Sequence, residues 1–299
     1  MKRYVLKTAI LIGLMYFNLL QIKAFICPDN SGAINVKNET TNKVWGDGVH
    51  DDTDAINNII EQYWGDFCST NEHDYRFLYF PNGTYLVSDT ILWERRVIMM
   101  GQSKNNTIIR LENAAAGYGY LANPAAVLRC RFDAKFRDPG CNDKDDSTPC
   151  YDCKAAGFDN NYDNDGATNS SFSNYIQDIT INCGRYNPGA IGISYNAHNE
   201  SAIRNVNIFA INNATCGLDL TETDFGPALL KDVYIWNFRT GIKTESGPGN
   251  VTLYNIDIED CDVCLDNSLH MSVYNLNCMT SAAPTIYPGG IKNSGAQLV

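Results

Sequence analysis

The sequence predicts an all-β solenoid, a right-handed parallel β-helix in which short strands stack one coil upon the next. A six-residue pattern of apolar residues around a central Asn or Asp recurs five times in the C-terminal part of the chain. The copies are Ile176–Ile181, Ile203–Ile208, Leu230–Ile235, Leu253–Ile258 and a degraded copy at Val273–Cys278. A period of 20 to 27 residues with alternating apolar pairs indicates one coil per repeat. Leucine-rich repeats share the period but need several leucines at fixed offsets, which are missing here.

The central residue of each copy forms a column of its own. Its members are Asp178, Asn205, Asp232, Asn255 and Asn275. Asn and Asp tolerate a left-handed bend and form hydrogen bonds along a stack of strands, so we expect this column to be structural. The apolar residues after the bend should then be buried in one continuous stack; they are Ile179, Ile181, Val206, Ile208, Val233, Ile235, Ile256 and Ile258.

The first 24 residues are typical of a secretory signal. A basic start precedes the mostly apolar run Ala9–Leu20, and Ala24 offers a small residue for cleavage. A membrane anchor is the alternative, but the run is short for a span and contains polar residues. We therefore expect a secreted protein in which residues 25–299 form one β-helix domain.

Removing this segment leaves 19 Lys and Arg against 34 Asp and Glu, a net charge of −15. This balance disfavours nucleic acid as a partner, because phosphate binding needs a basic surface. A polyanionic substrate is also disfavoured, unless a cation bridges it or a local basic patch contacts it. Local patches retain their influence because charges are screened over roughly 8 Å.

All eleven cysteines follow the signal segment. A secreted context favours disulfides, and the odd count leaves at least one thiol without an internal partner. Four of them lie within 24 residues, at Cys130, Cys141, Cys150 and Cys153. Two disulfides that staple a loop are favoured over a zinc site, because this cluster contains a single Cys-x-x-Cys pair.

An amphipathic helix is predicted to begin at Asp52–Asp54, because Ile56, Ile59, Ile60 and Tyr63 fall on one helical face. The first coil of a solenoid has an open apolar end, which such a helix covers. Strand patterns follow the helix up to Leu111. Residues 113–173 are polar and lack periodicity, which indicates an insertion loop that contains the cysteine cluster.

Three segments resemble successive motifs of the pectate-lyase-superfamily β-helix proteins. They are Gly46–Ile56, Phe80–Ser88 and Gly101–Leu111. This superfamily includes rhamnogalacturonase- and epimerase-like domains, relatives of the family 55 glucanases, and phage tailspikes. The resemblance implies the β-helix fold from Gly46 onward, but the superfamily spans lyases, hydrolases and non-enzymatic binders. Asp51 and Asp52 occupy the positions of the family's turn and helix cap, so the resemblance implies structural roles for them.

The set of acidic signatures of polygalacturonase-type hydrolases, Asn-Thr-Asp, Asp-Asp and Gly-His-Gly, is missing. The segment Arg239–Lys243 is only superficially similar to their Arg-Ile-Lys. The resemblance therefore supplies no catalytic residue.

The candidate catalytic residues come from a second element of each repeat. If Ile193, Leu218, Ile242 and Leu265 point inward, an outward column is formed by Ser194, Asp219, Lys243 and Asp266. Coils stack about 4.8 Å apart, so Asp219 and Asp266 would lie roughly 9–10 Å apart with Lys243 between them. This is near the upper end of the ~6.5–9.5 Å carboxylate separation of inverting glycosidases. The alternative is a charge ladder in which Lys243 offsets both carboxylates.

Candidate substrate-binding residues lie in two places. Glu222 and Asp224 follow the strand of Asp219 and could supply a second acid or a cation ligand. The column before the Asn and Asp residues reads Gln177, Arg204, Lys231, Tyr254 and Tyr274. Aromatic rings pack on sugar faces and cations meet carboxylates or hydroxyls, so this column suits a carbohydrate chain. Aromatic stacking that stabilises the coils is the alternative.

A candidate metal site lies in the insertion loop. Asn161, Asp163 and Asp165 precede Gly166 in the pattern of the first half of a calcium loop. Phe172 stands where an EF-hand has its glutamate, so an acidic loop without metal is the alternative. No cofactor is required, and calcium is the one candidate ion.

The predicted function is cleavage of an extracellular polysaccharide. Hydrolysis by paired carboxylates is preferred to β-elimination, because elimination needs a cation to neutralise the uronate and a base, and the acidic chain has few arginines. The alternatives are a glycan-binding or adhesive solenoid without activity, and a tailspike-like structural trimer.

The coil pattern continues to the last residues, where Ile291 has rung-like neighbours and Ala296–Val299 reads as a new strand. A solenoid needs a terminal cap, because its last coil otherwise exposes apolar core and unpaired backbone groups. We therefore expect that a further C-terminal segment or a second copy in a homo-oligomer covers this end.

Overall fold

A computed structural model describes residues 31–69, 76–93, 97–130, 173–197, 201–221, 225–247, 249–279 and 290–294. The signal segment, Cys141, Cys150 and Cys153 lie outside these residues, and so do the three candidate calcium ligands. The predictions that concern them stay predictions.

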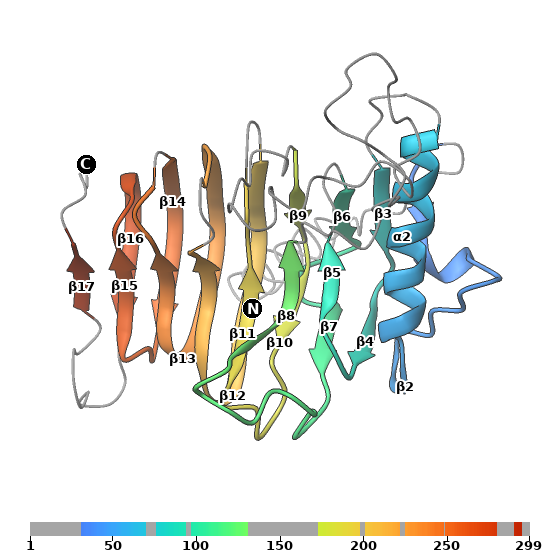
Figure 1. The fold of residues 1–299 in the computed structure, drawn as a ribbon, viewed down its shortest axis with the longest axis horizontal. Coiled ribbons are helices and arrows are strands. Elements are labelled where there is room, and N and C mark those ends of the chain that lie inside the picture. The colour runs from blue at the N-terminus through green and yellow to red at the C-terminus, as the bar shows by residue number, and fades with distance from the viewer. Residues whose placement is uncertain are drawn as a thin grey trace, which may run out of the picture.

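The described residues form a right-handed parallel β-helix, as predicted (Figure 1). One helix, α2 (Thr53–Ser69), and one short 3-10 helix, η1 (Val36–Asn38), accompany the strands. The strands of the N-terminal half are β1 (Ile34–Asn35), β2 (Asp47–Asp51), β3 (Arg76–Phe80), β4 (Gly83–Val87), β5 (Ile91–Trp93), β6 (Val97–Gly101), β7 (Thr107–Leu111) and β8 (Ala125–Cys130). Those of the C-terminal half are β9 (Tyr175–Gln177), β10 (Thr180–Asn182), β11 (Ala190–Ser194), β12 (Ser201–Leu220), β13 (Ala228–Thr244), β14 (Asn250–Glu259), β15 (Val263–Asn267), β16 (His270–Met279) and β17 (Gly290–Asn293).

Parallel pairing joins the coils in three ladders. The first ladder contains β1, β3, β6, β9 and the first residues of β12, β13, β14 and β16. The second contains β2, β4, β7, β10 and the middle or last residues of the same four long strands. The third contains β5, β8, β11, the ends of β12 and β13, then β15 and β17. Each coil therefore repeats the same three strand positions.

The Asn and Asp column lies at the bend between the first and second ladders. All five of its members have a positive φ, from 49° at Asn205 to 62° at Asn275. Side-chain amides connect successive coils: Asn205 donates to Asp178 at 2.5 Å, Asn255 to Asp232 at 3.0 Å and Asn275 to Asn255 at 3.0 Å. The structural role predicted for this column is confirmed.

The core runs through the interior of the coils as one cluster. The eight Ile and Val residues predicted to stack there are all buried, with at most 2% of any side chain exposed. Burial of an Ile or Val side chain contributes about 1.5–3 kcal/mol, so this column alone is a major source of stability. The prediction of a single continuous stack is confirmed.

Helix α2 covers one end of the stack, as predicted (Figure 1). Ile56, Ile59 and Ile60 are buried in the same core as the strands. On the flank of the helix, Asn57 donates to the carbonyl of Thr90 at 3.0 Å and accepts from the amide of Leu92 at 2.8 Å. The helix is thus fixed to the coil below it by both apolar and polar contacts.

Asp51 and Asp52 have structural roles, as the family resemblance implied. The Asp52 carboxylate accepts the backbone amides of Trp45 at 2.6 Å and Gly46 at 2.9 Å, so it closes the preceding loop. Burial raises the pKa of Asp52, although these two amides act in the opposite direction. Asp51 accepts from the amide of Thr53 at 3.0 Å, at the start of α2. Asp51 therefore serves the helix N-terminus, and the Asp52 side chain does not.

The first part of the predicted insertion loop contains a strand of the solenoid. Strand β8 lies within residues 113–173, and it pairs with β5 on one side and β11 on the other. Its residues Ala126, Val127 and Leu128 are buried. The expected loop is wrong for this strand, because β8 belongs to a coil that has no Asn or Asp at a bend to mark it. Cys130 ends the strand and accepts a hydrogen bond from Asn174 at 3.6 Å.

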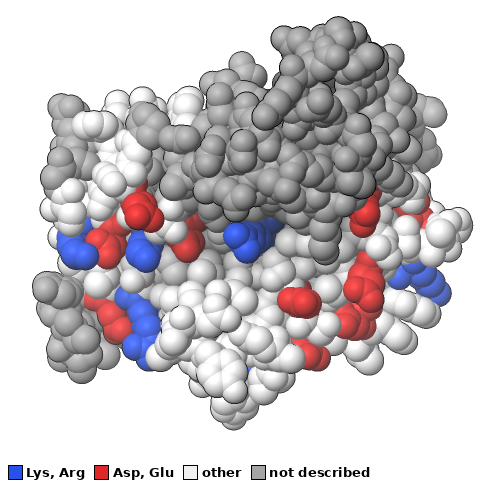
Figure 2. Space-filling model, in the orientation of Figure 1, with Lys and Arg blue, Asp and Glu red and all other residues white. Residues whose placement is uncertain are grey.

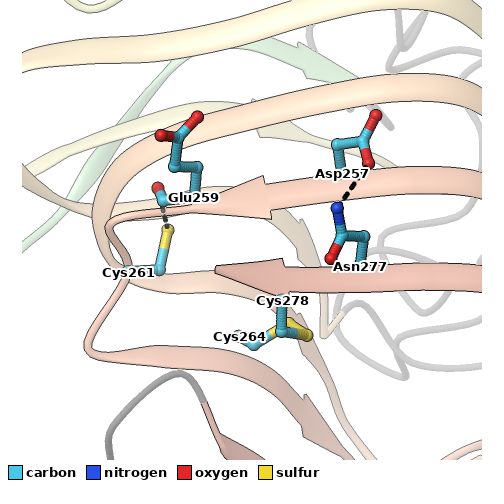
Figure 3. Close-up of a disulfide and its surroundings, with 6 residues drawn as sticks. All are labelled: Asp257, Glu259, Cys261, Cys264, Asn277 and Cys278. Atoms are coloured by element: carbon cyan, nitrogen blue, oxygen red, sulfur yellow. Dashed lines mark hydrogen bonds between the residues drawn. A yellow bond between two sulfur atoms is a disulfide. The ribbon is translucent and has the colours of Figure 1, made fainter. Parts of the chain in front are cut away.

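A disulfide joins Cys264 of β15 to Cys278 of β16, with 5.9 Å between their Cα atoms (Figure 3). It links the second and third ladders at neighbouring coils near the end of the stack. The sequence predicts disulfides in general but not this pair. No helix in the described part of the chain is long and apolar enough to cross a membrane.

Replacement of Asn255 tests the bend. Asn255→Ala should destabilise the protein by about 2–4 kcal/mol, because Ala in the left-handed region costs roughly 1–2 kcal/mol and the bonds to Asp232 and Asn275 are lost. Asn255→Gly keeps the bend without the steric cost and should recover about 1 kcal/mol. Urea unfolding measures both variants. Equal stability of Asn255→Ala and the wild type would contradict this role.

Candidate functional site

The predicted catalytic residues lie side by side on the outer surface of the third ladder. Asp219 pairs in register with Lys243, and Lys243 pairs with Asp266. Their neighbours Leu218, Ile242 and Leu265 are buried in the core. Since side chains alternate along a strand, the three charged side chains point outward, as predicted.

The column is longer than predicted and its charges alternate. Ser194 and Arg129 precede Asp219 in register, and Lys292 follows Asp266. Figure 2 shows a row in which basic and acidic side chains alternate across the strands at the β17 end of the molecule. We call Arg129, Ser194, Asp219, Lys243, Asp266 and Lys292 the charged column.

Contacts differ along the charged column. Lys292 donates to Asp266, with Nζ 3.1 Å from Oδ1 and 3.2 Å from Oδ2, and more than half of this lysine side chain is exposed. Asp219 accepts the amide of Thr221, two residues along the chain, at 3.1 Å. Within the described chain, Lys243 has no carboxylate oxygen within 4.0 Å. Lys243 is exposed, so its ammonium group remains open to solvent or a ligand.

The strands of Asp219 and Asp266 are separated by slightly more than the paired carboxylates of inverting glycosidases. Neighbouring strands lie about 4.8 Å apart, so the backbones of Asp219 and Asp266 are separated by roughly 9.6 Å. That value is close to the upper end of the ~6.5–9.5 Å range of inverting glycosidases, in which one carboxyl is the acid and the other activates water. Lys243 lies between them and could stabilise negative charge on either residue.

The predicted basic and aromatic column lies on the outer surface of the first ladder. Arg204 pairs with Lys231, Lys231 with Tyr254, and Tyr254 with Tyr274. Gln177 precedes them in register. The Lys231 ammonium lies 5.3 Å from the centroid of the Tyr254 ring, which is a cation–π distance.

The two tyrosine rings are not parallel. Their centroids are 6.4 Å apart and the ring planes are tilted by 40°. The side chains are 42% exposed at Tyr254 and 58% exposed at Tyr274, so ring surface remains free to contact a ligand. The exposed ring surface suits a carbohydrate ligand, and the contacts between neighbouring coils suit a structural role.

The second ladder carries an outward surface that the sequence analysis did not single out. Tyr234 donates to Glu259 at 2.7 Å, and Trp236 donates to Asp260 at 3.1 Å. Burial and the bond to Glu259 raise the pKa of Tyr234 well above its ordinary value. On the next coil, Asn277 donates to Asp257 at 3.3 Å (Figure 3). These carboxylates therefore connect neighbouring coils. The signal in the sequence was the position of Asp257, Glu259 and Asp260, which lie two, four and five residues after the bend residue Asn255.

Several predicted site residues cannot be placed. Glu222 and Asp224 lie outside the described residues, as do Asn161, Asp163 and Asp165. In the part of the chain that is described, no group of three or more His, Cys, Asp or Glu side chains is arranged to hold a metal. The calcium site stays a prediction.

Comparison with known proteins identifies the fold family. A family model described as "Rhamnogalacturonase A/epimerase, pectate lyase-like" matches residues 33–266. No curated protein matches the sequence.

Solved structures match this chain at low sequence identity. ORF18 of Geobacillus virus E2 is 12% identical with a TM-score of 0.42, over 90% of this chain and 62% of that one. The catalytic unit of a thermostable GH87 alpha-1,3-glucanase from Streptomyces thermodiastaticus strain HF3-3 is 12% identical with a TM-score of 0.41, over 86% and 48%. The Agl-KA catalytic domain is 13% identical with a TM-score of 0.42, over 92% and 48%. This chain thus spans 48–62% of the lengths of these three structures.

Replacement of Lys243 separates a functional column from a structural charge ladder. Lys243→Met should change the free energy of unfolding by less than about 0.5 kcal/mol, because this exposed lysine lacks a close ion pair in the described chain. Lys292→Met, which removes the ion pair with Asp266, is the control and should cost at most about 1 kcal/mol. Chemical unfolding of the two variants gives both values. A loss at Lys243 that exceeds the loss at Lys292 would favour the structural ladder.

Proposed function

This chain belongs to the rhamnogalacturonase A/epimerase, pectate lyase-like family, and we propose that it is a secreted enzyme that cleaves an extracellular polysaccharide at the charged column. The observation that carries the proposal is the parallel register that brings Asp219, Lys243 and Asp266 together on three neighbouring strands. Family membership adds a fold whose members include carbohydrate-processing enzymes.

Hydrolysis suits the charged column better than β-elimination. Two carboxylates at roughly 9–10 Å supply an acid and a base for attack by water. Elimination requires a base to remove a proton beside a uronate that a cation neutralises. The column offers Lys243 for such a task, but the acidic side chains beside it disfavour a polyuronate. We therefore propose a neutral or weakly charged glycan as the substrate.

The first-ladder column would bind the same chain. Tyr254 and Tyr274 offer exposed aromatic surface and Arg204 and Lys231 offer donors to sugar hydroxyls. The first ladder and the charged column lie on different sides of the coil. A polysaccharide that contacts both columns must therefore wrap around the solenoid or bind each column through a separate segment.

Secretion is supported by two features. The first 24 residues have the composition of a signal segment, and the Cys264–Cys278 disulfide suits an oxidising compartment. Mass spectrometry of the protein from a secreting host tests this part: the mature chain should begin near Phe25.

Activity on a panel of polysaccharides tests the reaction class. Polygalacturonate, rhamnogalacturonan and laminarin should be compared for reducing ends and for absorbance at 235 nm. Hydrolysis yields reducing ends without the absorbance, whereas elimination yields both. Binding without either signal would support the alternative of a glycan-binding solenoid, and neither binding nor cleavage would favour a structural protein of the tailspike kind.

Carboxamide substitutions test the proposed catalytic pair. Asp219→Asn and Asp266→Asn should each lower kcat by at least about a hundredfold, because acid–base catalysis contributes roughly 10²–10⁴ in rate. The melting temperature should stay nearly unchanged, because both side chains lie on the outer surface. Asp257→Asn, an exposed carboxylate on the second ladder, is the matched control. Unaltered turnover in both column variants would refute the assignment.

Removal of the aromatic rings tests the binding column. Tyr254→Ala and Tyr274→Ala should each weaken retention on the substrate polysaccharide several-fold, because each substitution removes an exposed aromatic surface that can pack on a sugar face. Tyr120→Ala removes a tyrosine outside the column that is 73% exposed, and it should have no effect. Affinity electrophoresis measures the retention. If the two column variants are retained as strongly as Tyr120→Ala, the column has a structural role and does not bind the substrate.

A further inference from the structure

Asn196 is a buried amide without a hydrogen-bond partner. Its side chain is 0% exposed, and neither Nδ2 nor Oδ1 makes a hydrogen bond. Among the described residues, one other buried side-chain atom is in this state, Nε of Arg110, and that guanidinium still donates through Nη2 to the carbonyl of Gly48 at 2.7 Å. Buried polar groups in proteins are normally bonded, so Asn196 requires an explanation.

Two other buried asparagines, Asn187 and Asn267, are bonded through both ends of the side-chain amide. Asn187 donates to the carbonyls of Glu112 at 2.7 Å and Cys183 at 2.9 Å, and it accepts from the amide of Ala115 at 2.8 Å. Asn267 donates to Leu269 and Asn293 and accepts from Thr244. These residues hold turns in place. Asn196 makes no such contact, so a structural role does not account for it.

The position of Asn196 places it next to the charged column. It follows β11, in which Ile193 is buried in the core, and the next alternate residues, Tyr195 and Ala197, are in the core as well. Ser194 therefore belongs to the opposite, outward side of the strand, and Asn196 follows it two residues after the end of β11. Ser194 pairs in register with Asp219, and the amide of Tyr195 donates to the carbonyl of Asp219 at 2.8 Å. Asn196 thus lies about 6.6 Å along the chain from the column.

The backbone on both sides of Asn196 is held firmly. The Tyr195 ring stacks on Trp93 with 5.5 Å between centroids, and its hydroxyl donates to the carbonyl of Asn174 at 2.9 Å. The carbonyl of Ala197 accepts from the amide of Gly226 at 2.6 Å. A side chain on such a support is positioned before any ligand arrives, which is the arrangement expected of a binding residue.

We propose that Asn196 is a ligand-binding residue whose amide takes two adjacent hydroxyls of a sugar unit held beside Asp219. A carboxamide offers donors through Nδ2 and an acceptor through Oδ1, and a vicinal diol offers the complementary pair. No internal hydrogen bond has to break for this contact. Since both amide atoms are covered, the atoms that cover them must withdraw when the sugar binds. The inference rests on the proposed function and adds a residue to its site.

The inference predicts that Asn196 lowers the stability of the ligand-free protein and raises its affinity for the sugar. An unpaired buried amide destabilises the ligand-free protein, and the contact with the sugar removes this cost. Replacement by an apolar side chain of similar size should therefore stabilise the free protein and weaken the complex. A structural asparagine would behave in the opposite way in the free protein.

Asn196→Leu provides the test, with Asn187→Leu as the matched control. The melting temperature should rise by about 2–4 °C for Asn196→Leu and fall for Asn187→Leu, which loses three hydrogen bonds. Affinity electrophoresis in gels containing polygalacturonate, rhamnogalacturonan or laminarin measures binding. On the polysaccharide that retards the wild type, Asn196→Leu should lose about tenfold or more in affinity.

Each other outcome is decisive. If the wild type is retarded and Asn196→Leu is retarded equally, this inference falls while the proposed function stands. If Asn196→Leu melts at a lower temperature or does not fold, the amide has a partner in the folded protein and the inference falls as well. If none of the polysaccharides retards or is cleaved by the wild type, the proposed function and the inference fall together.

Discussion

The single-residue bend between the first and second ladders is the constraint on which the rest of the structure depends. Asp178, Asn205, Asp232, Asn255 and Asn275 adopt positive φ, which most residues avoid, and three hydrogen bonds join their side chains between coils. A slip of one residue at any coil would put a side chain with no such tolerance into the bend. It would also turn the apolar face of a strand outward. The column therefore fixes the register of the stack.

Fixed register has a consequence for the outer surface. Residues at the same place in each coil form columns, so the chain can arrange charges or rings in a line without any loop to carry them. Asp219, Lys243, Asp266 and Lys292 alternate in sign on the third ladder, whereas Lys231, Tyr254 and Tyr274 adjoin on the first. The spacing in each column is set by the distance of about 4.8 Å between strands. A long polymer with a repeating unit is the kind of ligand that such a surface suits.

The sequence predicted those parts of the fold that repeat. The period, the bend and the buried Ile and Val residues were visible because each occurs in several coils, and the charged column followed from simple alternation along the strands. Strand β8 was missed because its coil lacks the bend residue that marks the others. The Cys264–Cys278 disulfide was not predicted because its pairing depends on which coils lie side by side. Asn196 was missed for a similar reason: its burial and its lack of a partner exist only in three dimensions.

The register of the charged column is the central claim, and cross-linking of paired cysteine substitutions tests it most directly. Lys243→Cys combined with Asp266→Cys places two thiols on adjacent strands, at a Cα separation of about 4.8 Å that a disulfide can span. Asp219→Cys combined with Asp266→Cys places them two strands apart, at roughly 9.6 Å, beyond the reach of a disulfide. Mass spectrometry after mild oxidation should find the cross-linked peptide for the first pair and not for the second. A cross-link in the second pair, or its absence in the first, would contradict the register.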